Sequence, residues 1–376
     1  MTVSNEENNL VRLGDYIELI DKRNSDLKYG ISDVCGISNN KEIIPTRANL
    51  EGTELHNFLV VEQEELIYNS RTTRMGDKIG LGFNDTGKTL ITSWNNTAFR
   101  VKSESKGLLL PLFLFIYFKR SEFDRYTRYN SWGSSTEIFS WDSMCDVKIP
   151  LPPIEVQQEL VDTYDGLKAL SEQNEALIKP LTEACRAYIA ECKKKYDEVE
   201  LGEYIEEVNE KNSEGKYIDV KGLSTLKKFR EPNSRVDRNE LRGYKIVYNN
   251  CFAYVPTTDT WKVFACALNN GKTFVVSPIY GVFRVCNNLL LSEFLNILFQ
   301  PQEFDRYVRY NSWGSARENF NFSDLSNVKI PLPPSEVQQT IVNLYNCAEE
   351  AKRIANEARE KMKNLCPALV QRAIYG

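Results

Sequence analysis

The chain has 376 residues, of which 42% are hydrophobic and 26% charged, and its formal net charge is −5. This length predicts two or three domains. The acidic balance argues against a broadly basic surface, so any DNA contact has to be a local patch. A single histidine and nine cysteines without a CxxC pair argue against a zinc site and a disulfide framework, and they predict a cytoplasmic protein with reduced thiols. The longest apolar run, Leu108–Phe118, is too short to span a membrane, and the polar N-terminus has neither a signal nor a transit-peptide pattern.

Residues 1–153 are predicted to form a first body of mixed α and β structure. Within it, LITSWNNTAFRV at 90–101 reads as two strands joined by a turn, and a helix is expected at about 107–120. GFNDTGKT at 82–89 satisfies the phosphate-binding pattern GxxxxGK followed by Ser or Thr. A genuine phosphate-binding loop is followed by a helix, whereas residues 90–101 read as two strands. The matching place in the second half of the chain also has Cys266 instead of the first glycine. We therefore interpret the segment as a turn between strands.

A helical spacer is predicted over residues 154–198. It follows KIPLPP at Lys148–Pro153, whose prolines stop the preceding structure. Spacings of four and three residues alternate along it, which is typical of a coiled-coil seam. The seam residues are Leu160, Tyr164, Leu167, Ser171, Asn174, Ile178, Leu181, Cys185, Tyr188 and Cys192. Pro180 is expected to kink or break this helix.

A second body is predicted over residues 199–334 and a C-terminal helix over 335–376. In the body, Asn270-Gly271 lies between two β-rich runs and predicts a hairpin, and one helix is expected at about 288–300. A second KIPLPP, at Lys329–Pro334, precedes the C-terminal helix, and Pro367 is expected to kink or break the end of that helix. Its seam residues are Ile341, Leu344, Ala348, Ala351, Ala355, Ala358, Met362, Leu365 and Leu369.

Much of the second half repeats the first. Phe123–Tyr164 and Phe304–Tyr345 align without a gap at a shift of 181 residues, with 26 identities in 42 positions. Shorter matches pair 11–17 with 199–205 and 97–101 with 281–285, and the sequence between them diverges. Such a long shift indicates a duplicated domain with its linker. We predict an α+β fold in which two similar mixed α/β domains are separated by two long helices forming an antiparallel coiled-coil pair. The alternative is two independent helices, each covering its own domain.

The repeated segments Asp124–Ser135 and Asp305–Arg317 contain Arg, Tyr, Asn, Ser and Trp, residue types that suit nucleic acid. Because sequence-reading residues should differ between modules, we interpret the repeated aromatic residues as structural and place Arg128, Arg309 and the Ser-Trp-Gly-Ser turns near phosphates. Alternatively, the repeated arginines pair with Asp124 and Asp305. The divergent loops are better candidates for reading bases, although any one residue there could instead be a solvated loop residue. They supply the candidates Asn69, Arg71, Thr72, Arg74, Lys78, Trp94, Asn95, Lys228, Arg230, Thr257, Thr258, Lys262 and Tyr280, and Arg317 is added from the repeated segment.

No catalytic or metal-binding constellation is visible. There is no glycine-rich SAM-binding turn after a strand, no Asn/Asp-Pro-Pro-Tyr/Phe tetrapeptide and no Ser/His/Asp set. We therefore expect a non-catalytic chain without a cofactor or metal of its own.

The ordered, duplicated motifs resemble the specificity subunit of Type I restriction-modification systems. The resemblance is carried by Ile149–Gln158 and Ile330–Gln339, each before a long helix, and by SPIYGVFRV at 277–285 with its weaker partner SWNNTAFRV at 93–101. It covers nearly the whole chain. It implies two target recognition domains, each reading one half of a bipartite DNA target through the major groove. Because the two bodies differ, the target is expected to be asymmetric.

The same resemblance implies the partners. The helix pair would set the spacer and dock modification (methyltransferase) subunits, two of them, and restriction subunits would complete the assembly. SAM for adenine-N6 methylation, and ATP and Mg for translocation and cleavage, would belong to those partners. The candidate docking residues are Leu160, Leu167, Ile178, Ile341, Leu344 and Met362. Two alternatives stay open: a two-headed protein scaffold without DNA contact, and an enzyme with an unrecognised site, which the single histidine disfavours.

Overall fold

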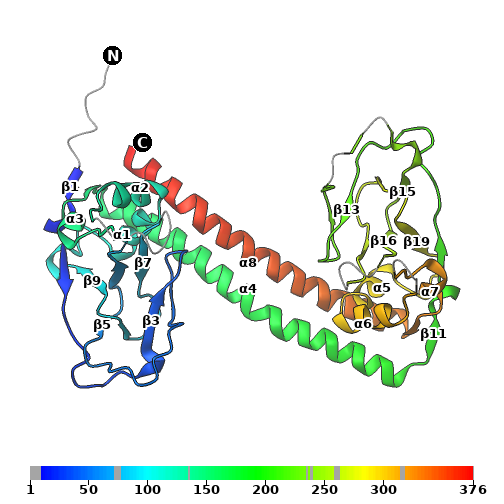
Figure 1. The fold of residues 1–376 in the computed structure, drawn as a ribbon, viewed down its shortest axis with the longest axis horizontal. Coiled ribbons are helices and arrows are strands. Elements are labelled where there is room, and N and C mark those ends of the chain that lie inside the picture. Colours follow the sequence, from blue (N-terminus) through cyan, green and yellow to red (C-terminus); the bar gives the residue numbers. More distant parts are fainter. Residues whose placement is uncertain are drawn as a thin grey trace, which may run out of the picture. The chain divides into compact units, whose positions relative to one another are not determined.

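The structure, a computed structural model, describes residues 10–71, 78–133, 136–233, 236–237, 240–257, 263–313 and 318–375, with side chains as far as residue 364. The chain divides into two compact units, Met1–Gln173 with Ile354–Gly376, and Asn174–Arg353 (Figure 1). Each unit contains one mixed body and a part of each of two long helices. This combination of helices and sheets confirms the predicted α+β class.

The body of unit 1 is built on two four-stranded sheets. One has the strand order β2-β9-β6-β7 and the other β4-β3-β8-β5, and a separate β1-β10 pair joins the two ends of the body. The elements are β1 (Leu10–Arg12), β2 (Ile17–Ile20), β3 (Val34–Ile37), β4 (Ile43–Pro45), β5 (Leu59–Val61), β6 (Leu66–Asn69), β7 (Gly80–Phe83), β8 (Leu90–Thr92), β9 (Asn96–Val101), α1 (Pro111–Phe118), α2 (Ser121–Tyr129), α3 (Trp141–Cys145) and β10 (Lys148–Pro150). Phe99, Phe113 and Phe118, which are fully buried, centre the core between the first sheet and the short helices.

Unit 2 repeats this plan with a smaller second layer. Its β12-β19-β16-β17 sheet corresponds to β2-β9-β6-β7, whereas β15-β18 and β13-β14 are separate pairs, and β11-β20 joins the ends. The elements are β11 (Glu198–Glu200), β12 (Ile205–Glu207), β13 (Gly222–Leu223), β14 (Phe229–Arg230), β15 (Lys245–Val247), β16 (Cys251–Tyr254), β17 (Cys266–Leu268), β18 (Phe274–Val276), β19 (Gly281–Val285), α5 (Ser292–Leu298), α6 (Gln302–Tyr310), α7 (Phe322–Ser326) and β20 (Lys329–Pro331). Phe252, Phe264 and Phe283 are buried in its core.

The repeated motifs at the two ends of each body pack on each other. β10 and β20 are the KIP parts of the two KIPLPP motifs, and each pairs antiparallel with the first strand of its own body. The glycine that follows that strand is required by a close approach. A Cβ on Gly14 would lie 2.8 Å from Cβ of Cys145, and one on Gly202 would lie 2.9 Å from Cβ of Ser326. The duplicated Leu-Gly and KIPLPP motifs therefore close the bodies.

The glutamine of the repeated EVQQ motif is a buried anchor. Gln157 is fully buried; its Nε2 donates to the carbonyls of Leu108 and Pro152, each at 2.8 Å, and its Oε1 accepts from the amide of Leu110 at 3.0 Å. Gln338 makes the same three contacts in unit 2. Buried polar groups need such partners. The motif thus ties the start of each long helix to the segment that leads into α1 or α5.

The two long helices are α4 (Ile154–Lys195) and α8 (Ser335–Tyr375). In unit 1 they lie side by side, with the Ser171 hydroxyl donating to the Ala355 carbonyl at 3.3 Å. The alanines of the predicted seam, Ala348, Ala351, Ala355 and Ala358, are all buried. Tyr188 was expected in the seam but is 45% exposed, because the neighbouring Ile189 packs on the core instead. Neither Pro180 in α4 nor Pro367 in α8 breaks its helix, since both helices continue past these residues.

Two local predictions were wrong. Each body has three short α-helices where one was expected, because the repeated DRY segments form α2 and α6 and the segments before the KIPLPP motifs form α3 and α7. Asn270-Gly271 does not make a hairpin, since β17 and β18 belong to different sheets. The buried Asn269 donates to the carbonyls of Val247 and Tyr248 at 3.1 and 3.0 Å and so directs the turn from one layer to the other. The GFNDTGKT segment is, as predicted, a turn between strands: it joins β7 to β8.

Candidate nucleic-acid interface

In unit 1 the repeated block holds both ends of a divergent segment, residues 71–78. Before this segment, the amide of Phe139 donates to the Ser70 carbonyl at 2.8 Å. After it, the amide of Ile79 donates to Oδ1 of Asp124 at 3.1 Å. Phe139 and Asp124 both belong to the repeated block. The duplicated frame therefore fixes where the divergent segment leaves the body and where it returns.

Unit 2 holds its divergent segment, residues 257–263, in the same way. The amide of Phe320 donates to the Pro256 carbonyl at 2.8 Å, and the amide of Phe264 donates to Oδ1 of Asp305 at 3.0 Å. Phe320 and Asp305 stand at the repeat positions of Phe139 and Asp124. The same repeated block thus holds two segments of unlike sequence.

A buried lysine completes each anchor. Lys41 Nζ lies 2.8 Å from Asp124 Oδ1, and Lys227 Nζ lies 2.7 Å from Asp305 Oδ1. All four side chains are at most 10% exposed. Each lysine also donates to a carbonyl of Phe118 or Phe299, at 2.7 and 2.5 Å, where α1 or α5 ends. Both lysines stand in turns with a left-handed backbone, at φ of 60° and 56°.

The burial of these charges has an electrostatic cost. Burial lowers the pKa of Lys41 below its ordinary value, while the Asp124 carboxylate acts in the opposite direction. Buried charges persist when they are paired and hydrogen-bonded. Here Oδ1 of Asp124 contacts the Lys41 ammonium group and accepts a hydrogen bond from the backbone amide of Ile79. The arrangement holds the end of the divergent segment, the β3–β4 turn and the end of α1 at one point.

The predicted alternative for the repeated arginines is wrong for two of them. The buried aspartates pair with lysines, whereas Arg125 pairs with Glu122 at 3.2 Å and Arg306 pairs with Glu303 at 3.1 Å. Arg128 and Arg309 are exposed in the last turns of α2 and α6, where we predicted phosphate contacts.

The interpretation of the repeated aromatic residues as structural fits Tyr126, whose ring packs against Phe123 and Phe139, but is wrong for others. Tyr129 is 82% and Trp132 75% exposed. Their counterparts Tyr310 and Trp313 are 85% and 73% exposed. Amphipathic periodicity could have revealed the exposure of the two tyrosines, because α2 and α6 each bury only one narrow stripe, whereas the tryptophans lie beyond these helices. The repeated block therefore also presents an aromatic surface.

The structure places the other candidates of unit 1 around the divergent segment. Asn69 ends β6, and its Oδ1 accepts the amide of Arg71 at 3.0 Å. Lys78 is exposed at the other end of the segment. Trp94, 59% exposed, and the half-buried Asn95 stand in the turn between β8 and β9.

In unit 2 several candidates make contacts within the protein. Lys228 pairs with Glu349 of α8 at 3.1 Å, and Arg230 donates to the Glu231 carbonyl at 2.9 Å. The half-buried Tyr280 accepts a backbone amide of β13 at 3.4 Å. Thr257 begins the divergent segment and donates to the Asn319 side chain at 3.2 Å. The candidates Thr72, Arg74, Thr258, Lys262 and Arg317 lie outside the described residues.

All the candidate docking residues of the helices except Ile178 pack on the apolar cores of their units. Leu160 and Ile341 are 7% and 0% exposed, and both belong to the apolar cores of their units. Leu167, Leu344 and Met362 are partly buried against the same cores, and Ile178 is half-buried. The heptad pattern identified these residues as apolar contacts but could not say which surface they contact.

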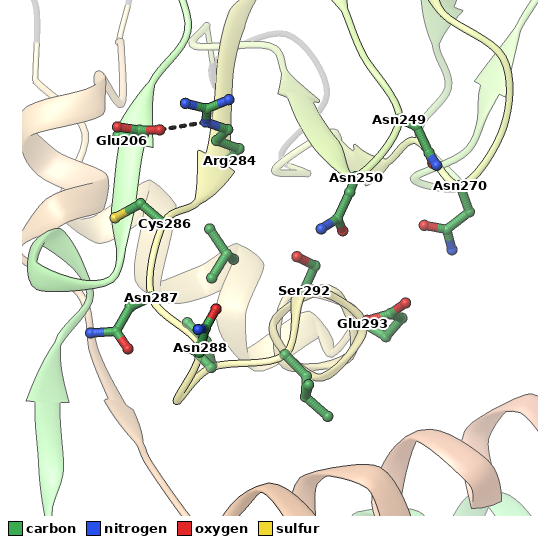
Figure 2. A pocket seen from close by; sticks show the side chains of 13 residues that line it. Glu206, Asn249, Asn250, Asn270, Arg284, Cys286, Asn287, Asn288, Ser292 and Glu293 are labelled. Atoms are coloured by element: carbon green, nitrogen blue, oxygen red, sulfur yellow. Dashed lines mark hydrogen bonds and ion pairs between the residues drawn. The ribbon is translucent and has the colours of Figure 1, made fainter.

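Unit 2 also has an open hollow away from these candidates (Figure 2). Asn249, Asn250 and Asn270 line it from turns, and Arg284, paired with Glu206, lines another side. The charges of that pair cancel, so the hollow offers asparagine amides together with the Glu293 carboxylate. Over the described ranges, no group of three or more His, Cys, Asp or Glu side chains could hold a metal ion. None of the helices in those ranges is long and apolar enough to cross a membrane.

The fold and the two anchored segments define a two-module binding protein whose modules share a frame and differ in what they present. A family model of the Type I restriction modification DNA specificity domain matches residues 5–183 and 260–347, more than half of the chain. The chain belongs to this family, and the resemblance seen in the sequence is confirmed. A search of the curated proteins found no match.

Three solved structures are similar over nearly their whole length. The S subunit of a Type I restriction-modification system from M. genitalium is 10% identical, with 99% of this chain and 98% of that chain covered and a TM-score of 0.61, which indicates a shared fold. The HsdS subunit from Thermoanaerobacter tengcongensis is 17% identical, with coverage of 100% and 98% and a TM-score of 0.38. A chain from a study of complex assembly and conformational transition of the type I R-M system is 16% identical, with coverage of 98% and 97% and a TM-score of 0.38.

Proposed function

We propose that this chain is the specificity subunit of a Type I restriction-modification complex, in which each unit reads one half of an asymmetric bipartite DNA target in the major groove. The observation that carries the proposal is the anchoring of two unlike segments by one repeated frame. Direct readout needs side chains that differ between half-sites, on backbones held in a fixed place. The divergent segments meet the first need and the anchors meet the second.

The long helices set the spacing between the half-sites in this proposal. Each is continuous over about 40 residues, and both contribute to both units. A paired helix resists bending better than a flexible linker, so the spacer length of the target follows from helix length. Each helix is also tied to a body: Lys168 of α4 pairs with Asp85 at 2.5 Å, and Glu349 of α8 pairs with Lys228 at 3.1 Å.

Partner subunits supply the chemistry in this proposal. Two modification subunits carry SAM and methylate adenine at N6, and restriction subunits carry ATP and Mg for translocation and cleavage. Because most of the predicted docking residues pack on the apolar cores, we assign the contact to exposed apolar residues of α4 in unit 2, Leu177 and Tyr188, which are 51% and 45% exposed. They stand 11 residues apart, close to three helical turns, and so share one face. Co-purification of the modification subunit with the L177S/Y188S variant should fall, whereas I218S, a change at another exposed apolar residue, should leave it intact.

The reading role is tested by exchanging one divergent segment in the co-expressed complex. Residues 71–78 are replaced by an unrelated segment, with Ser70 and Ile79 retained, and methylated adenines are mapped across the host DNA. We expect one half of the target to change or methylation to be lost, with the other half unchanged wherever a new target appears. The matched exchange of residues 257–263 should alter the opposite half. If either exchange altered both halves, or if both left the target as it was, the modular assignment would be wrong.

A further inference from the structure

Each unit presents a pair of large aromatic side chains that its own core does not use. Tyr129 and Trp132 in unit 1, and Tyr310 and Trp313 in unit 2, are each more than 70% exposed. Aromatic side chains of this size normally bury most of their surface, and their exposure in a cluster marks an interaction surface. We call these two pairs the aromatic turns.

The aromatic turns are identical in the two units, although the neighbouring segments are not. Both belong to the sequence RYNSWGS, which occurs at 128–134 and again at 309–315. A surface that serves unlike half-sites with the same residues has to contact something the two sites share. In double-stranded DNA the shared element is the sugar-phosphate backbone, which carries no direct sequence information.

In unit 1 the aromatic turn is continuous with the divergent segment. The amides and carbonyls of Trp132 and Ile138 bond to each other in both directions, at 3.2 and 3.0 Å. Ile138 also forms a bridge with Arg71, where the divergent segment begins. Neighbouring strands lie about 4.8 Å apart, so Trp132 is roughly 10 Å from that segment. DNA that contacts the segment therefore passes within reach of the aromatic turn.

Unit 2 repeats this juxtaposition. Trp313 and Asn319 exchange backbone hydrogen bonds at 3.2 and 3.0 Å, and Asn319 bridges Thr257 at the start of the second divergent segment. The exposed guanidinium-bearing residues Arg128 and Arg309 immediately precede Tyr129 and Tyr310. A guanidinium group can bind a phosphate, and an exposed aromatic ring can pack on the apolar face of a deoxyribose.

We propose that the aromatic turns are sequence-independent DNA contacts, which pack on the sugar-phosphate backbone next to the bases read by the adjoining divergent segment. This inference rests on the proposed DNA-reading function. The repeated block then has two roles: it anchors the divergent segment, and it contacts the DNA backbone next to that segment. Loss of the aromatic rings weakens binding to every sequence alike, whereas loss of a reading residue relaxes the choice of one base.

The test uses the co-expressed complex carrying W132A and W313A together, with I218A as the control at another exposed apolar residue. Two duplexes are titrated over a range of salt concentrations: one of random sequence, and one enriched by the wild-type complex from a random pool. We expect roughly tenfold or greater weakening for both duplexes, as for truncation of central interface tryptophans, with their affinity ratio unchanged. The I218A complex should bind both duplexes as the wild type does. The thermal stability and subunit composition of both variant complexes should equal those of the wild type.

Three outcomes would overturn the inference. Unchanged affinity for both duplexes would show that the rings do not contact DNA. Weakening confined to the enriched duplex would make the tryptophans sequence readers. Loss of the modification subunit from the variant, with DNA affinity of the remaining complex unaffected, would assign the turns to a protein interface. Failure of the wild-type complex to bind either duplex would instead refute the proposed function itself.

Discussion

Removal of the Asp124 carboxylate should strongly destabilise unit 1, because it leaves a buried ammonium group without its counter-charge. In D124A, Lys41 keeps the Phe118 carbonyl at 2.7 Å and the Phe123 ring but has no counter-charge, and the amide of Ile79 loses its 3.1 Å acceptor. Breaking a buried ion pair by deleting one partner costs about 3–5 kcal/mol. The surface pair of Glu122 with Arg125, at 3.2 Å, lies on the same helix, and E122A should cost less than about 1 kcal/mol.

Hydrogen exchange followed by mass spectrometry measures the loss in unit 1 peptides separately from those of unit 2. The opening free energy of peptides around residues 79–83 and 121–129 should fall by about 3–5 kcal/mol in D124A. The K41M/D124A double variant removes the orphaned cation and should recover part of the loss. An effect of D124A no larger than that of E122A would refute the anchoring role. A double variant less stable than D124A would show that the unpaired charge is not the cause.

Three further predictions concern the frame and the core. G202A should lower the free energy of unfolding by about 1–3 kcal/mol in denaturant titration, because its Cβ would lie 2.9 Å from that of Ser326, whereas G166A in α4, which meets nothing within 4 Å, should raise stability by up to about 1 kcal/mol. Q338L should lose about 3 kcal/mol in the same titration, since Gln338 is fully buried and three backbone groups lose their partner. Burial raises the pKa of the Cys35 thiol from its ordinary value of 9.0 to about 11. The thiol therefore contributes its full stabilisation below about pH 9 and loses it as the pH rises toward 11, because the thiol of the unfolded chain ionises first. The C35A variant should show a smaller decline in the free energy of unfolding between pH 8 and 10.5.

The repeat and the heptad seams could be predicted from the sequence because both are periodic patterns of residue type. The exposure of Trp132 and Trp313 could not, since identical residues in two copies fit a structural role as well as a shared binding surface. The buried lysines escaped detection for another reason. Lys41 and Lys227 lie 186 residues apart, outside the 181-residue register, in stretches without similarity. The two lysines are equivalent because both have a left-handed backbone and both pair with the repeated aspartate, and no local sequence motif predicts either property.

The Asn270-Gly271 turn shows how tertiary contacts override local signals. Its composition favours a hairpin, yet the side chain of Asn269 binds carbonyls at the end of β15 and sends the chain into another layer. Similarly, Pro180 lies within a continuous helix although proline removes one helical hydrogen bond.

The anchors of the divergent segments grip main-chain atoms on the segment side: the carbonyls of Ser70 and Pro256, and the amides of Ile79 and Phe264. Every residue has that carbonyl, and every residue except proline has that amide. The two segments already differ in length by one residue, eight in 71–78 against seven in 257–263. Segments of another sequence or length can therefore replace these two without a compensating change at the anchoring residues. Changes within either segment leave the anchoring contacts in place, provided that positions 79 and 264 keep their backbone amides and their buried side chains.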